Sequence, residues 1–147
     1  SENQSIRARL LDLYEELPPF HEARSVLNTL REFGHPTAVF SNASPNMLNK
    51  ALIASDLRSL FTEIISVDSL KKYKPSPEVY ELVIRQFKCS PHDITFFSSN
   101  NWDISGANSF GFKTVWINRQ SVPWDALPGA PDLTAKSLPD ALQVIDL

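Results

Sequence analysis

Four short runs of apolar and β-branched residues constrain the fold of this chain most. They occupy residues 37–40, 64–67, 94–97 and 114–117. Each run has the length of a strand and is almost continuously apolar, which is typical of parallel strands covered on both faces. Segments with helical features separate the runs, and this alternation indicates a parallel sheet with right-handed crossovers. The pattern therefore predicts an α/β domain.

Start and stop signals place helices between the predicted strands. Ser44-Pro45 and Ser76-Pro77 each combine an N-cap residue with a proline in the first turn. A glycine follows two other helical segments and is expected to end them. The predicted helices cover residues 21–33, 45–54, 77–88, 102–110 and 137–145. The Pro-rich segment 121–132 is predicted to be a loop.

The N-terminal segment has the periodicity of one more helix. Its apolar residues recur with a helical period and are Ile6, Leu10, Leu11, Tyr14 and Leu17. The dipeptide that follows, Pro18-Pro19, is expected to stop a helix. We therefore predict a helix over residues 6–17.

Composition limits the function classes. The chain has 147 residues, 42% hydrophobic and 21% charged, which is too apolar for a disordered chain and suits one domain. A net charge of -3 offers no basic field for a phosphate backbone, so no nucleic acid partner is expected. No apolar run has the length of a membrane span. The single cysteine, Cys89, excludes an internal disulfide framework and predicts a reducing compartment, the cytoplasm.

Polar residues gather at the ends of the predicted strands, where ligands bind in open α/β sheets. The four strands run into Ser41-Asn42, Asp68, Ser98-Ser99-Asn100 and Asn118-Arg119. Lys74 follows the second strand, and Asp103 falls in the first turn after the third. Taken alone, each residue is explained by a turn or a helix cap. Their gathering at one edge of the sheet favours a small polar site.

Each of these residues has a chemical use. Ser41 and Asn42, with backbone N–H groups at a helix start, can form an anion cradle. Lys74 can hold a neighbouring carboxylate in its ionised form. Asp103 can orient or deprotonate a water molecule. Asn100 can hold a carbonyl oxygen or its developing oxyanion.

Several blocks of the sequence together resemble one known family. The blocks are residues 41–48, 66–68, 73–80, 97–103, 106–107, 110–112, 116–119 and 131–132. They include Ser-Ser-Asn-x-Trp-Asp and Lys-Pro-x-Pro-x-x-Tyr, a combination that is highly specific. From about residue 10 to its end the chain closely resembles the L-2-haloacid dehalogenases, the type II haloacid dehalogenases of the HAD superfamily.

The resemblance implies a Rossmann-like three-layer core and hydrolytic dehalogenation of a small 2-halocarboxylic acid, without a metal or another cofactor. In the family, an aspartate on the first strand attacks the carbon that bears the halogen. Water then cleaves the resulting ester, and the configuration at that carbon is inverted.

Four residues are implied to bind substrate. Ser41 and Asn42 would contact the substrate carboxylate and the surroundings of the nucleophile. Tyr80 would support the site from its helix, and Trp102 would line the pocket. Tyr80 is equally well explained as a helix residue that packs on the sheet.

Four further residues are implied to take part in catalysis. Lys74 would pair with the nucleophilic carboxylate. Ser98 and Asn100 would orient the catalytic carboxylates, and Asp103 would help to activate water.

The positions of the acidic residues distinguish a dehalogenase from a phosphatase of the same superfamily. Such phosphatases place carboxylates in the segment after the third predicted strand to hold Mg²⁺, a cation that requires oxygen ligands. This chain has Ser98, Ser99 and Asn100 there, with Asp103 as the charged residue. No metal site is expected, and a dehalogenase is favoured over a phosphatase. The histidines, His21, His35 and His92, have no spacing that suggests a metal, and Cys89 is expected to be an inert thiol.

The family also begins with a strand that ends in the nucleophilic aspartate, followed by a helical cap, and neither matches this chain. We therefore expect residues 1–20 to be a remnant of the cap and its hinge, and residues 21–147 to be a core that lacks its first, central strand. Asp68 matches an additional aspartate of the family rather than the nucleophile. A core without its central strand exposes strand edges, so we expect a homo-oligomer, a complementing N-terminal segment, or a sheet closed differently. Inactivity of the chain alone is expected, and a non-catalytic binding or assembly module is the alternative.

Overall fold

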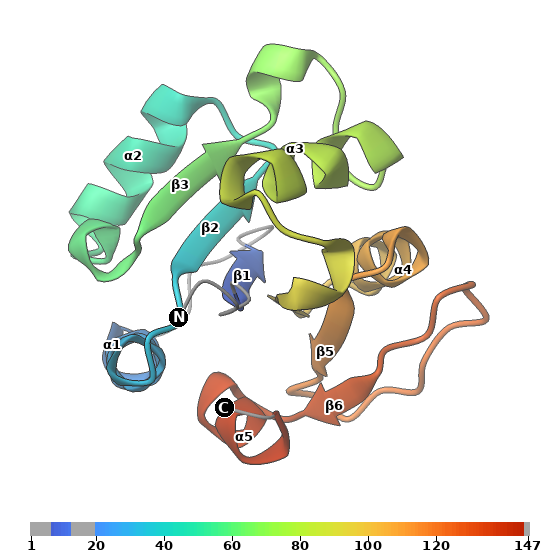
Figure 1. The fold of residues 1–147 in the computed structure, drawn as a ribbon. Coiled ribbons are helices and arrows are strands. Elements are labelled where there is room, and N and C mark those ends of the chain that lie inside the picture. Colours follow the sequence, from blue (N-terminus) through green and yellow to red (C-terminus); the bar gives the residue numbers. More distant parts are fainter. Residues whose placement is uncertain (1–6, 13–19, 146–147) are drawn as a thin grey trace.

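In the computed structural model, the described residues, 7–12 and 20–145, form a six-stranded sheet flanked by helices (Figure 1). The strands lie in the order β3-β2-β1-β4-β5-β6. Their bounds are β1 Ala8–Asp12, β2 Thr37–Ser41, β3 Glu63–Ser66, β4 Ile94–Ser98, β5 Lys113–Ile117 and β6 Leu133–Ala135. Neighbouring strands in this order are all parallel, which confirms the predicted α/β architecture.

The helices lie where the start and stop signals predict them, with ends that differ by no more than one residue. They are α1 Phe20–Glu32, α2 Pro45–Ala54, α3 Pro77–Phe87, α4 Asn101–Phe110 and α5 Leu138–Val144. Ser44 caps α2, since its hydroxyl accepts a hydrogen bond from the Met47 N–H at 3.3 Å. Ser76 stands at the start of α3, but its hydroxyl donates to the Glu78 carboxylate instead. Short 3₁₀ turns lie at Arg58–Leu60, Asp68–Leu70 and Pro91–Asp93.

Two apolar clusters fill the two sides of the sheet. One includes Leu11 and Leu27 and draws on α1, α2 and α5. The other includes Leu10 and Phe96 and draws on α3 and α4. Leu10 and Leu11 are neighbours on β1 and belong to different clusters, as expected when successive side chains of a strand point to opposite faces.

The predicted helix over residues 6–17 is wrong, because residues 8–12 form β1. The centre of the sheet is occupied, since β1 lies between β2 and β4 and pairs with both, which is the differently closed sheet that was one of the expected outcomes. The tertiary structure overrides the helical periodicity of residues 8–12. The facing edges of β2 and β4 carry backbone N–H and C=O groups that a strand between them can hydrogen-bond and a helix cannot. The predicted helix positions 6 and 13–17 lie outside the described residues. The division of the chain at residue 20 stays a prediction.

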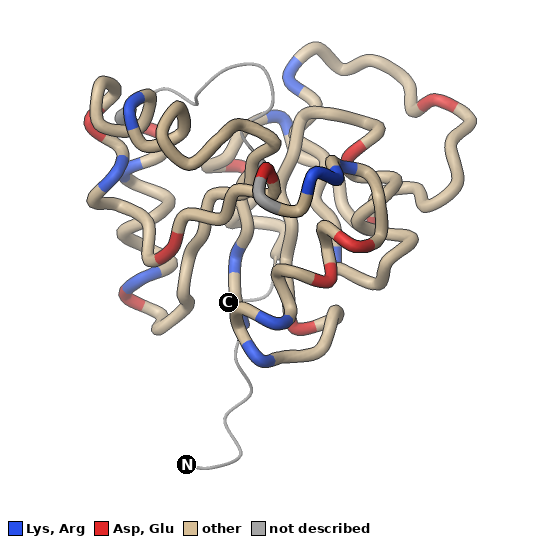
Figure 2. The backbone as a smooth tube through the Cα atoms, turned by 90° about the horizontal axis from the view of Figure 1, so that it is seen from above, with Lys and Arg blue, Asp and Glu red and all other residues tan. Residues whose placement is uncertain are grey.

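β6 was not predicted from the sequence. Its three residues are too few to carry a periodic signal, and the loop before it is held by polar contacts. Asp132 Oδ2 accepts a hydrogen bond from the Thr114 N–H at 2.8 Å, which draws the loop against β5. Figure 2 shows basic and acidic residues mixed along the described backbone.

Candidate active site

The carboxyl edge of the sheet brings together residues from β2, β4 and the segments that follow them. Ser41 is the last residue of β2 and Ser98 the last of β4, and both are buried. Parallel strands direct their carboxyl ends to one edge. The structure therefore brings the predicted Ser41 and Ser98 to the same edge of the sheet.

Lys74 and Asp103 form a buried ion pair at this edge. Lys74 Nζ lies 2.6 Å from Asp103 Oδ2, and the two side chains are 4% and 1% exposed. The same ammonium donates a hydrogen bond to the Phe40 carbonyl oxygen at 3.3 Å. It also lies 4.8 Å from the centre of the Phe40 ring, within the range of a cation–π interaction. The lysine is thus fixed against the end of β2.

Tyr80 holds the other side of the same carboxylate. Its hydroxyl donates to Asp103 Oδ1 at 2.6 Å, and its ring is fully buried on α3. The ring packs edge-on against Phe96 and Phe112, with centroids 6.4 and 5.6 Å away. Tyr80 therefore packs on the sheet and also contacts the site, the two explanations that the sequence left open. Both Asp103 oxygens accept bonds, so this carboxylate is fixed in orientation.

Asn42 and Ser41 shape the loop at the start of α2. Asn42 Oδ1 accepts a hydrogen bond from the Lys74 backbone N–H at 3.1 Å, which ties the β3–α3 connection to the end of β2. Ser41 Oγ accepts from the Ala43 N–H at 3.0 Å. Contact of these residues with a substrate carboxylate stays a prediction.

Ser98, Asn100 and Trp102 shape the start of α4. Ser98 Oγ accepts from the Asn100 N–H at 2.9 Å, and Asn100 Oδ1 accepts from the Trp102 N–H at 3.1 Å, which is an N-cap. This cap positions Asp103 in the first turn of the helix. Trp102 is 61% exposed, so an apolar ring stands open to solvent beside the predicted site.

Gly106 is a site residue that the sequence analysis did not single out. A Cβ atom at this position would lie 2.6 Å from Pro75 Cβ and 2.7 Å from Tyr80 Oη. The absence of a side chain lets α4 approach closely enough for the Tyr80 hydroxyl to reach Asp103. The signal in the sequence is a glycine inside a helical pattern, which indicates a close approach.

Other polar residues at the predicted strand ends are engaged elsewhere. Asp68 Oδ1 accepts from the Tyr73 hydroxyl at 3.1 Å, and Arg119 forms an ion pair with Glu22 of α1 at 3.3 Å. Asn118 Oδ1 accepts from the Val122 N–H at 3.1 Å within its own loop. Among the described side chains, Lys74, Asp103 and Tyr80 form a connected cluster at the edge that these contacts do not involve.

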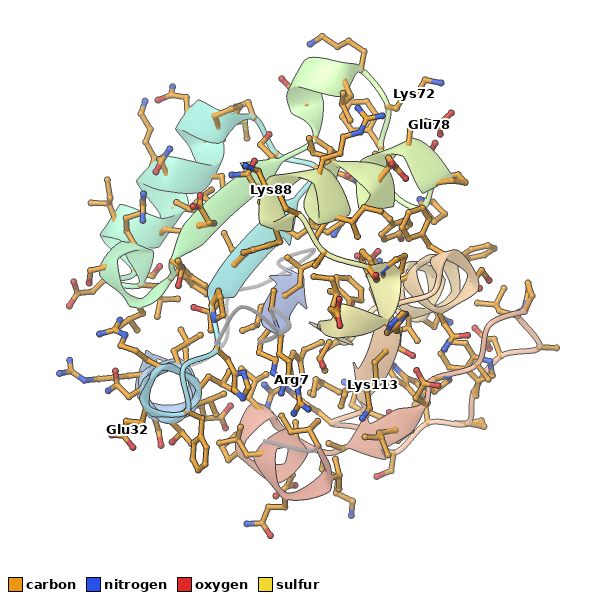
Figure 3. All side chains as sticks on the ribbon, viewed as in Figure 1. Arg7, Glu32, Lys72, Glu78, Lys88 and Lys113 are labelled. Atoms are coloured by element: carbon orange, nitrogen blue, oxygen red, sulfur yellow. The ribbon has the colours of Figure 1, made fainter. Side chains whose placement is uncertain are left out.

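Two ionisable groups outside this cluster have shifted pKa values. The pKa of Glu78 is lowered from 4.5 to about 2, because Ser76, its own backbone N–H and Lys72 all stabilise the carboxylate. Lys72 and Glu78 lie together beside the start of α3 (Figure 3). Burial raises the pKa of the Cys89 thiol, and the nearby Asp93 charge adds to the shift. A raised thiol pKa agrees with the inert thiol predicted for Cys89.

Within residues 7–12 and 20–145, no three His, Cys, Asp or Glu side chains are grouped so that they could hold a metal ion. The helices among those same residues include none that is long and apolar enough to cross a membrane.

Comparison with known proteins identifies the family. The family model of the haloacid dehalogenase-like hydrolases matches residues 4–111. The curated (S)-2-haloacid dehalogenase 1 of Pseudomonas sp. (strain CBS-3) is 43% identical over 122 residues, which are 83% of this chain and 54% of that protein. The chain thus spans about half the length of the curated relatives it matches.

Solved structures agree with the sequence relatives. The L-2-haloacid dehalogenase of Xanthobacter autotrophicus, solved with chloropropionic acid covalently bound, is 28% identical with a TM-score of 0.79, over 87% of this chain and 61% of that one. Another L-2-haloacid dehalogenase, RSc1362, is 25% identical with a TM-score of 0.85, over 95% of this chain and 98% of that one. The chain belongs to the haloacid dehalogenase-like hydrolases.

Proposed function

We propose that the site hydrolyses the carbon–halogen bond of a small 2-halocarboxylic acid and replaces the halogen by a hydroxyl group. The observation that carries this proposal is the buried cluster of Lys74, Asp103 and Tyr80 at the carboxyl edge of the sheet. It is supported by relatives that are named (S)-2-haloacid dehalogenases. A cytoplasmic location is part of the same proposal.

The residues of the site have different roles in this reaction. Ser41 and Asn42, at the start of α2, receive the substrate carboxylate. Lys74 keeps the nucleophilic carboxylate ionised, because an adjacent ammonium favours the charged form. Trp102 covers the apolar part of the substrate from the rim.

Asp103 acts in this proposal through its fixed orientation. Its carboxylate is bound by Lys74 and Tyr80, so it holds the ammonium in place and directs the hydrolytic water. Ser98 and Asn100 fix the start of α4 and thereby orient the catalytic carboxylates.

The proposal includes a source for the nucleophile. The sequence predicts that the nucleophile comes from a complementing N-terminal segment, in which case the purified chain alone releases no halide.

The test is chloride release from (S)-2-chloropropionate, measured with and without a synthetic peptide that carries the first strand of (S)-2-haloacid dehalogenase 1. Release that persists in EDTA supports the metal-independent reaction. No release under either condition contradicts it and leaves the non-catalytic module. Mg²⁺-dependent release of phosphate from a phosphate ester, without chloride release, indicates the phosphatase.

A further inference from the structure

The backbone around Ala43, between β2 and α2, is held by two serines of neighbouring strands. Ser41 Oγ, at the end of β2, accepts a hydrogen bond from the Ala43 N–H at 3.0 Å. Ser66 Oγ, at the end of β3, donates to the Ala43 carbonyl oxygen at 2.6 Å. Ser41 and Ser66 are register partners in the parallel pairing of these strands. The turn that leads into α2 is therefore fixed from both strands.

The Ser66 hydroxyl has a defined orientation because it is bound on both sides. It accepts a hydrogen bond from the Asp68 N–H at 3.3 Å, at the start of the connection from β3 to α3. A serine hydroxyl has one proton to donate, and here that proton goes to the Ala43 carbonyl oxygen. Ser66 thus joins the turn before α2 to the connection that carries Lys74.

The bond from Ser66 also sets the direction of the peptide group between Ala43 and Ser44. The C=O and N–H of a trans peptide lie in one plane and point in opposite directions. A carbonyl that is bound to the end of β3 therefore directs the Ser44 N–H away from β3, which is the outer strand of the order β3-β2-β1.

The Lys74 ammonium lies on the same side, away from β3. The Ser41 carbonyl oxygen accepts a hydrogen bond from the N–H of Val67, the residue after β3, at 3.1 Å. Successive carbonyl groups of a strand point to opposite sides, so the Phe40 carbonyl points away from β3. Lys74 Nζ donates to this Phe40 oxygen at 3.3 Å. The Ser44 N–H is thus directed to the side of β2 on which the buried ammonium stands.

We infer that Ser66 is a positioning residue for substrate binding, because its hydroxyl orients the peptide that presents the Ser44 N–H to the substrate carboxylate. This inference rests on the proposed function, in which the start of α2 receives that carboxylate. The carboxylate of a 2-haloacid keeps its charge while the carbon–halogen bond breaks, so a donor that faces it stabilises the ground state and the transition state alike. Loss of the Ser66 hydroxyl should therefore weaken binding and leave the chemical step unchanged.

The test compares three single variants of the whole chain with the wild type. Ser66→Ala removes the hydroxyl, and Ser66→Thr keeps it at a strand position that suits a β-branched residue. Ser55→Ala is the matched control, because the Ser55 hydroxyl donates to the Ala51 carbonyl oxygen at 2.7 Å at the opposite end of α2. Thermal unfolding shows which variants are folded.

Two measurements are made, each with and without the peptide that carries the first strand of (S)-2-haloacid dehalogenase 1. The first is the Kd of propionate, which has the carboxylate and no halogen, from the shift of the Ser44 amide signal in ¹H–¹⁵N NMR spectra. The second is the kcat and KM of chloride release from (S)-2-chloropropionate.

Ser66→Ala is expected to raise the Kd of propionate and the KM together by about 3- to 10-fold, the range for one lost hydrogen bond, with kcat unchanged. Ser66→Thr is expected to restore the wild-type values, and Ser55→Ala to keep them. A merely structural role of Ser66 would lower the unfolding temperature without this split between KM and kcat.

An unchanged Kd and KM in Ser66→Ala, a loss confined to kcat, or an equal loss in Ser66→Thr overturns the role of Ser66 and leaves the proposed function intact. A wild-type chain that binds no propionate overturns that role as well, whether or not it releases chloride. Propionate binding that Ser66→Ala weakens, in a chain that releases no chloride with or without the peptide, supports the role of Ser66 and overturns the proposed reaction.

Discussion

The ammonium of Lys74 is held 2.6 Å from the carboxylate of Asp103, with both side chains almost fully buried. Lys74 comes from the segment between β3 and α3, and Asp103 from the first turn of α4, so this contact ties the two halves of the sheet edge together. Removing one partner of such a pair leaves the other charge buried without compensation.

Asp103→Asn is expected to lower the free energy of unfolding by about 3–5 kcal/mol at neutral pH. The amide keeps the shape of the side chain but removes the negative charge that lies 2.6 Å from the Lys74 ammonium. Glu81→Gln is the matched control, because the Glu81–Arg85 pair at 3.7 Å is 43% and 76% exposed and contributes less. Urea denaturation measures both variants. Equal losses in the two variants would contradict a special role for the buried pair.

Gly106→Ala is expected to destabilise the protein by about 1–3 kcal/mol, because the added Cβ overlaps Pro75 and the Tyr80 hydroxyl. Helix propensity alone predicts the opposite sign, a gain of up to about 1 kcal/mol. Tyr80→Phe removes one of the two overlapping atoms, so the cost of Gly106→Ala should shrink in that background. A double-mutant cycle of unfolding free energies tests this coupling. A Gly106→Ala variant that is more stable than the wild type would contradict this prediction, because it would show that the space beside α4 accommodates a Cβ atom.

Arg9 distinguishes a strand from a helix at residues 8–12. In β1 the Arg9 side chain is 3% exposed, and its guanidinium donates a hydrogen bond to the Thr95 hydroxyl. In a helix whose apolar stripe faces the protein, the same side chain would face solvent. Arg9→Glu is therefore expected to cost about 3 kcal/mol or more, since it places an acidic group in the core. Arg7→Glu, at the exposed residue just before β1 (Figure 3), is expected to change stability by less than about 0.5 kcal/mol. Similar thermal unfolding of the two variants would argue against β1.

Glu78 gives a prediction for acid pH. Its pKa is about 2 in the folded chain against an ordinary 4.5, so its contribution to stability is present above pH 4.5 and is lost as the pH falls toward 2. The first cause is the Ser76 hydroxyl, so Ser76→Ala should raise the pKa of Glu78 toward its ordinary value. Carbon-13 NMR titration of the Glu78 carboxyl measures both. A carboxyl that titrates near 4.5 in the wild type would contradict the Ser76 contact.

The sequence predicted β2 to β5 and the five helices because their signals are local. Continuous apolar runs mark β2 to β5, and Ser44-Pro45 gives the first residue of α2. Residues 8–12 carry a stripe that fits either a helix or a strand, and their state is decided by the slot between β2 and β4. Whether a position between two strands is open depends on the tertiary structure, which the periodicity of the sequence does not reveal.

The site was predicted in part for a similar reason. Strand order places Lys74 and Asp103 at one edge, which the sequence could give. Their direct contact depends on the path of the segment before α3 and on the space left by Gly106.

Chiral analysis of the product is the decisive test of the proposed hydrolysis of the carbon–halogen bond. The purified chain, with and without the peptide that carries the first strand, is incubated with (S)-2-chloropropionate, and chloride and the enantiomers of 2-hydroxypropionate are measured together. Attack by a carboxylate at C2 predicts equimolar chloride and 2-hydroxypropionate of the inverted, (R) configuration. A folded chain that releases no chloride with or without the peptide, or a product that retains the (S) configuration, would contradict the proposed function.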